Sequence, residues 1–266
     1  MTTSPLLPLT AADLPPLAPE LVLIGSAFAL MILDLFVSNR NKIVTHLFSL
    51  AALAVVLFML ATGVGGQGEV FHGMFVRDTA ADVMKTGIVL LSGLTLVYGW
   101  RYLRDRNLFQ GEIPVLILFG TAGMMILVSA GSLLMVYLGL ELLALCSYAL
   151  VASNRENGLA SEAAMKYIVL GSLASGLLLY GMSLIYGATG SLHLDVIREA
   201  IPHSEERVLL ITGAVFMIAG VAFKLGAAPF HMWLPDVYQG APAPIALFIS
   251  SAPKLAAFGM AYRLLE

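Results

Sequence analysis

Long apolar runs alternate with short polar connections along the whole chain. A helix needs roughly 20 apolar residues to cross a bilayer, and the runs at about 17–37, 43–62, 81–100, 113–130, 132–152, 164–187, 208–228 and 242–265 meet that length. No run shows the strict alternation of a membrane β-barrel strand. Because a backbone in lipid must satisfy its own hydrogen bonds, the pattern predicts an all-α, polytopic membrane helix bundle with about eight transmembrane helices.

The composition supports the same class. The chain has 266 residues, of which 59% are hydrophobic and 12% charged, whereas soluble domains carry about 25% charged residues. No basic patch with interleaved aromatic residues is present, so nucleic acid is not an expected partner, and the lipid bilayer is. Cys146 is the single cysteine, and the five histidines are too scattered for a metal motif.

Positive charges in the connections predict the orientation of the helices. Alternate connections carry unequal numbers of basic residues: one set holds Arg40, Lys42, Arg101, Arg104, Arg106 and Arg155, and the other holds Arg77, Arg198 and Arg207. The richer set is expected in the cytoplasm, which places the N-terminus outside. The connection 187–206 also contains apolar residues that predict a short amphipathic helical turn.

Three charged residues of the predicted membrane segments stand out, two of them near the middle of a segment and one late in its segment. They are Glu141, Lys224 and Lys254, and a charge near the centre of a membrane helix costs about 2.5–3.5 kcal/mol on insertion scales. Helical spacing places Glu141 on one face with Tyr137 and Tyr148. A lysine whose carboxylate partner can approach or retreat can bind and release a proton, so a proton relay is one interpretation. The alternatives are an interhelical hydrogen bond for Glu141 and snorkelling to an interface for Lys224.

Prolines interrupt the chain directly after Lys224. The four residues Pro229, Pro235, Pro242 and Pro244 cannot sit freely in one continuous helix, so the seventh helix is predicted to be broken. Discontinuous membrane helices commonly mark ion sites. His231 lies where it could extend a relay from Lys224, although an interfacial histidine fits the spacing equally well.

Other charges are expected at helix ends. Glu20 is placed at the end of the first helix, and Asp82 and Lys85 flank the start of the third, so these are predicted to be interfacial. Glu162 and Lys166 have the i, i+4 spacing of a surface ion pair.

The segment "FKLGAAPFHMWLPDVYQGAPAPIALFISSAPKLAAFG", with "LGLELLALCSYALVA" before it, resembles the antiporter-like membrane subunits of proton-pumping NADH:quinone oxidoreductase, respiratory complex I. The resemblance is strong over 113–266. Two sister branches of that family usually have a histidine near the position that Lys254 occupies here. The lysine therefore favours the third branch.

The resemblance implies roles for particular residues. Glu141 and Lys224 match a glutamate–lysine pair, Lys254 matches the next lysine on a central hydrophilic axis, and His231 and Asp236 match polar positions of the broken segment. The function implied is proton translocation driven by quinone reduction elsewhere in the complex. A cation/proton antiporter, a membrane-hydrogenase subunit or a non-conducting scaffold remain the alternatives.

The family fold also implies a domain organisation and a cellular setting. Residues 1–112 would hold three N-terminal transmembrane helices, and 113–266 the first five-helix repeat of a longer antiporter-like fold whose second repeat lies outside this sequence. No cofactor is expected in this chain; flavin, iron–sulfur clusters and quinone would belong to partner subunits. The implied partners are other membrane subunits, including sister antiporter-like subunits, in a bacterial inner membrane.

Overall fold

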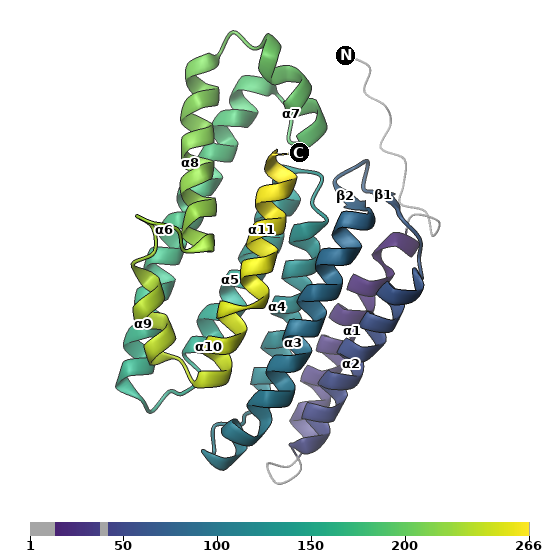
Figure 1. Cartoon of the computed structure of the whole chain (residues 1–266), viewed down its shortest axis with the longest axis vertical. Coiled ribbons are helices and arrows are strands. Elements are labelled where there is room, and N and C mark those ends of the chain that lie inside the picture. The colour runs from purple at the N-terminus through teal and green to yellow at the C-terminus, as the bar shows by residue number, and fades with distance from the viewer. Residues whose placement is uncertain (1–13, 38–41, 266) are drawn as a thin grey trace.

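The computed structural model describes residues 14–37 and 42–265, and it is built almost entirely of helices (Figure 1). Arg40, counted above for the orientation, lies outside the described residues. The α-helices of the described residues are α1 (Ala18–Phe36), α2 (Ile43–Thr62), α3 (Thr79–Asp105), α4 (Glu112–Val128), α5 (Leu133–Val151), α6 (Gly158–Thr189), α7 (Leu194–Ala200), α8 (Arg207–Leu225), α9 (Trp233–Gly240), α10 (Ala243–Ser250) and α11 (Ala252–Leu265). Two short 3-10 helices, η2 (Pro15–Leu17) and η4 (Ile201–His203), and two strands, β1 (Gly68–Val70) and β2 (Phe75–Arg77), complete the described elements.

The predicted membrane bundle is confirmed. Seven helical segments of the described chain are long and apolar enough to cross a membrane. The one remaining predicted segment, 113–130, corresponds to α4, which is apolar but has only 17 residues. α6 begins at Gly158 rather than near 164, because Asn157 accepts a hydrogen bond from the Leu159 N–H and starts the helix before its apolar part.

α4 forms the centre of the bundle. It packs against α1, α3, α5 and α11, and most of its side chains are buried. Its apolar residues face neighbours all round, as expected for a helix without a polar face. The elements that carry the charged residues of the second half are therefore arranged around a fixed apolar core.

α6 and α8 form a closely packed pair on one side of the bundle (Figure 1). Small residues allow this approach: a Cβ at Gly213 would lie 2.9 Å from the carbonyl oxygen of Gly181, and a Cβ at Gly181 would lie 2.7 Å from that of Gly213. Gly220 packs in the same way on Leu178. Small residues at a membrane helix interface permit such contact between backbones.

Three connections meet at one end of the bundle. β1 and β2 form an antiparallel hairpin between α2 and α3, and isolated bridges join Phe75 to Ala130 and Ser132 to His193. The predicted helical turn in 187–206 is confirmed as α7. The hairpin was not predicted, because three-residue strands are too short for a periodic signal.

The last predicted segment differs from the expectation of one helix. It is divided into α10 and α11 at Ser251, whose backbone angles are φ −112° and ψ −84°. Pro253 lies in the first turn of α11, the position in a helix that tolerates a residue without an N–H. Lys254 therefore lies in the first turn of a new helix, α11.

Candidate functional site

The break after α8 has a defined backbone geometry. α8 ends at Leu225, and Gly226 adopts the left-handed conformation with φ +75°. The Gly226 N–H donates to the carbonyl of Phe223 (3.0 Å), and the Ala227 N–H donates to that of Ala222 (2.9 Å). This glycine-dependent ending explains why the helix stops one residue after Lys224, at Leu225.

Side chains also donate hydrogen bonds to the carbonyls at the end of α8. Lys254 Nζ donates to the carbonyl oxygens of Lys224 (3.1 Å) and Leu225 (3.0 Å), and Trp233 Nε1 donates to that of Phe223 (3.0 Å). An unsatisfied carbonyl in a lipid environment costs several kcal/mol. Lys254 and Trp233 thus stabilise a helix end that would otherwise be costly in a membrane.

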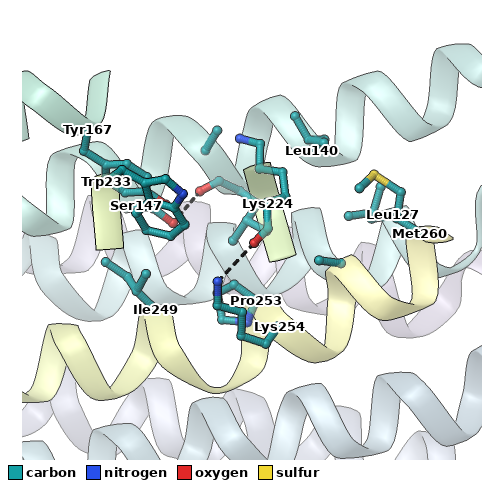
Figure 2. Close-up of a pocket in the computed structure, with 13 residues that line it drawn as sticks. Leu127, Leu140, Ser147, Tyr167, Lys224, Trp233, Ile249, Pro253, Lys254 and Met260 are labelled. Carbon is teal, nitrogen blue, oxygen red and sulfur yellow. Dashed lines mark hydrogen bonds between the residues drawn. The ribbon is translucent and has the colours of Figure 1, made fainter. Parts of the chain in front are cut away.

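A small cavity lies between the two membrane lysines (Figure 2). Its volume is about 20 Å³, which is room for about one water molecule. Lys224 and Lys254 supply its charged lining, Ser147 and Tyr167 its hydroxyls, and apolar side chains of α4, α5, α10 and α11 most of the rest. In Figure 2 the Lys254 side chain points toward the Lys224 carbonyl, while the Lys224 side chain runs the other way.

Glu141 lies beside this cavity but is not one of its lining residues. One carboxylate oxygen, Oε1, is buried without a hydrogen-bond partner. Glu141 interacts electrostatically with Lys224 and with Tyr137 and Tyr148 on its own helix face. No ion pair joins Glu141 to Lys224 among the described residues, so the two charges are neighbours without direct contact.

His231 and Asp236 lie away from the cavity. Both are exposed in this chain. Asp236 forms an ion pair with Lys166 (3.1 Å), which also pairs with Glu162 (2.9 Å). The expected surface pair of Glu162 and Lys166 is confirmed, and Asp236 ties α9 to it. The structure does not bring these residues together with Lys224 and Lys254.

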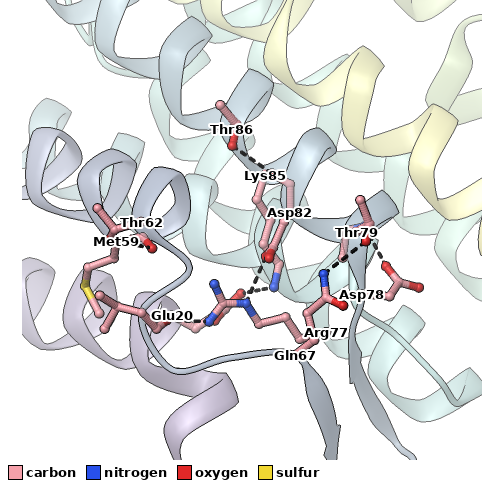
Figure 3. Close-up of polar contacts among 12 residues, drawn as sticks. Glu20, Met59, Thr62, Gln67, Arg77, Asp78, Thr79, Asp82, Lys85 and Thr86 are labelled. Atoms are coloured by element: carbon pink, nitrogen blue, oxygen red, sulfur yellow. Dashed lines mark hydrogen bonds and ion pairs between the residues drawn. The ribbon is translucent and has the colours of Figure 1, made fainter.

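A second cluster of charges was not predicted. Glu20 and Lys85, expected at the interface, are instead buried and form an ion pair of 2.7 Å between α1 and α3 (Figure 3). The Lys85 ammonium lies 5.0 Å from the centre of the Phe75 ring. The burial of this pair was not predicted, because it depends on the β1–β2 hairpin over this end of the helices, and nothing in the local pattern of α1 or α3 indicates that cover.

Two further ion pairs surround that buried pair. Arg77, itself buried, contacts Asp82 (2.9 Å), and Asp78 contacts Arg263 of α11 (2.7 Å). Burial by itself raises the pKa of Asp78, but the hydrogen bonds from Arg263 and from the Ala81 N–H outweigh it and hold this pKa below its ordinary value. The cluster joins α1, the β1–β2 hairpin and α3 to the end of α11.

The fold and these sites define a polytopic helical membrane protein with a discontinuous helix and two partly buried lysines beside the break. The chain belongs to the NADH:quinone oxidoreductase/Mrp antiporter family of transmembrane proteins, whose family model matches residues 130–266.

Named relatives and solved structures give the same result. The chain is 82% identical over all its 266 residues to NADH-quinone oxidoreductase subunit N of Xanthomonas euvesicatoria, covering 55% of that protein. It is 51% identical over 93% of its length to the subunit of that name in Halorhodospira halophila, covering 51% of it. A chain of respiratory complex I from Thermus thermophilus matches 92% of this chain with a TM-score of 0.78 and 32% identity, and 52% of that chain is covered. The chain thus spans about half the length of the relatives it matches.

Proposed function

We propose that this chain is part of a proton-translocating membrane subunit of a bacterial NADH:quinone oxidoreductase. The observation that carries the proposal is the cavity between Lys224 and Lys254 at the end of a broken membrane helix. Two lysines that line space for one water offer a route for a proton between consecutive membrane segments. The names of the similar proteins and the family membership support the same assignment.

Each charged residue has a distinct role in this proposal. Lys224 holds a proton that the nearby carboxylate of Glu141 stabilises. When the two charges separate, the ammonium of Lys224 loses that stabilisation and releases its proton toward Lys254 through the water-sized cavity. His231 and Asp236 act at the edge of this path, since both are exposed and Asp236 is engaged with Lys166.

The surroundings of the chain are part of the same proposal. Residues 113–266 form the first five-helix repeat, after three helices within 1–112. Flavin, iron–sulfur clusters and quinone belong to partner subunits, and sister antiporter-like subunits are neighbours in the bacterial inner membrane. The N-terminus faces the periplasm, as the basic connections predict.

Glu141→Gln in the full-length protein within its assembled complex tests the proposal. The amide keeps the size of the side chain and removes its charge, so we expect the complex to assemble and proton uptake into vesicles to slow by tenfold or more, on the order of a lost charge interaction in a buried site. Glu112→Gln is the control, because Glu112 is exposed and pairs only with Arg155 among the described residues. Unchanged uptake with Glu141→Gln would favour a scaffold instead.

A further inference from the structure

Trp233 occupies a fixed position at the start of α9. Its side chain is buried, with 2% of its surface exposed. The indole stacks on Tyr167 of α6 at 4.8 Å and 9°, and on Phe223 of α8 at 5.5 Å and 27°. Its Nε1–H donates to the Phe223 carbonyl. Contacts with two helices and one directed hydrogen bond leave the ring little freedom to rotate.

The Lys254 ammonium sits against this ring. Its Nζ lies 4.8 Å from the ring centre of Trp233 and donates to the carbonyls of Lys224 and Leu225. The face of an aromatic ring attracts a cation, most strongly for tryptophan. The C-terminal end of a helix, with its free carbonyls, does the same. Two carbonyls and one ring therefore form three sides of a seat for the ammonium group.

From this geometry we propose that Trp233 is a positioning residue for Lys254. Its ring holds the ammonium from one side, and its Nε1–H fixes the end of α8 whose carbonyls hold the ammonium from the other. Trp233 thus determines both the ring contact and the position of the carbonyls that hold the ammonium. Without the ring and without the hydrogen bond that fixes the helix end, the ammonium could leave both carbonyls and turn into the neighbouring cavity, where Lys224 is also present.

This seat gives the Lys254 ammonium a defined position before any proton moves. The ammonium has three N–H groups, and the carbonyls engage two of them. The same lysine lines the cavity. The effect of Trp233 on proton movement rests on the proposed function, whereas its effect on the position of Lys254 does not.

Two substitutions in the full-length protein within its assembled complex separate the contributions of Trp233. Trp233→Phe keeps an aromatic face and loses the Nε1–H donor, and Trp233→Leu loses both. Phe230→Leu is the control, since Phe230 lies in the same broken segment and lines a pocket with Trp233 without contacting Lys254. The first measurement is an experimental structure of each complex, read at the distances from Lys254 Nζ to the carbonyls of residues 224 and 225.

We expect Trp233→Leu to release Lys254 from both carbonyls, Trp233→Phe to keep at least one, and the control to keep both. Retention of both hydrogen bonds in Trp233→Leu would overturn the proposal. If neither Trp233 variant assembles while the control does, Trp233 is required for folding, and the positioning role is rejected.

A double-mutant cycle tests the link to transport. Proton uptake is measured for Trp233→Leu and for Lys254→Met, which removes the cation, alone and together. If Trp233 acts through Lys254, the combined loss is smaller than the product of the single losses by about 2- to 30-fold, the range of a cation–π contact. A multiplicative loss overturns the coupling to Lys254. If no Lys254 variant affects uptake, the proposed function fails, while the structural measurement still decides the positioning role.

Discussion

Lys85→Met is expected to destabilise the protein strongly, although Lys85 lies far from the proposed proton path. The Lys85–Glu20 pair has an N–O distance of 2.7 Å, and the two side chains are 0% and 3% exposed. Removing one partner of such a pair leaves a buried charge without compensation, which costs about 3–5 kcal/mol. A factor of ten corresponds to about 1.4 kcal/mol, so the ratio of folded to unfolded protein falls by roughly two to four orders of magnitude if the reference equilibrium is unfolding.

Replacing both partners isolates the cause. Glu20→Met with Lys85→Met removes both charges and keeps side chains of similar length, so most of the lost stability is expected to return. Arg155→Met is the control, because the Arg155–Glu112 pair has a similar distance of 2.8 Å but is exposed at 72% and 46%. Exposed pairs contribute little, and this variant should behave as the unchanged protein.

The assay is the amount of assembled complex on native gels and the temperature at which the solubilised complex dissociates. We expect the order to be Lys85→Met lowest, the double variant intermediate or normal, and Arg155→Met normal. If Lys85→Met assembled and dissociated at the same temperature as the unchanged protein, the reasoning from burial of this ion pair would be refuted.

Two further predictions concern packing and pH. Gly213→Ala should weaken the α6–α8 contact by about 1–3 kcal/mol, because its Cβ would lie 2.9 Å from a backbone oxygen that cannot rotate away. Gly176→Ala has open space around its Cβ and should leave the dissociation temperature of the complex unchanged, so equal effects of the two variants would contradict the packing argument. The pKa of Asp78 is held below its ordinary value of 3.8, so its contribution to stability is present above about pH 4 and is lost as the pH falls through the lower, folded-state value. Thermal dissociation of the complex, followed from pH 7 to pH 3, should show a smaller acid-dependent loss of stability for Asp78→Asn than for the unchanged protein, and an equal loss in the two would rule out this contribution.

The membrane helices could be predicted from the sequence because they depend on local pattern. Apolar runs of sufficient length placed α2 at 43–62, the range it occupies in the structure. The high cost of a membrane charge selected Lys224 and Lys254, and both line the same cavity. Length and desolvation cost are properties of single segments, so one sequence is enough to evaluate them.

The contacts between distant segments could not be predicted in the same way. The hydrogen bonds of Lys254 join residues about thirty positions apart, and they depend on how α8 ends and on the break at Ser251. The burial of Glu20 and Lys85 depends on a hairpin with very short strands. The resemblance to a family supplied roles for His231 and Asp236, but their exposure follows from how α9 packs against α6 and has no local signal.

The proposed proton path depends most directly on Lys224, so the decisive measurement is the number of protons taken up per NADH oxidised by Lys224→Ala in the full-length protein, within its assembled complex in sealed vesicles. Lys42→Ala is the matched control, because Lys42 pairs with Asp34 (2.8 Å) away from the break. The proposal predicts normal assembly, with fewer protons per NADH or slower turnover for Lys224→Ala and unchanged values for Lys42→Ala. Normal turnover with an unchanged number of protons per NADH for Lys224→Ala would contradict it.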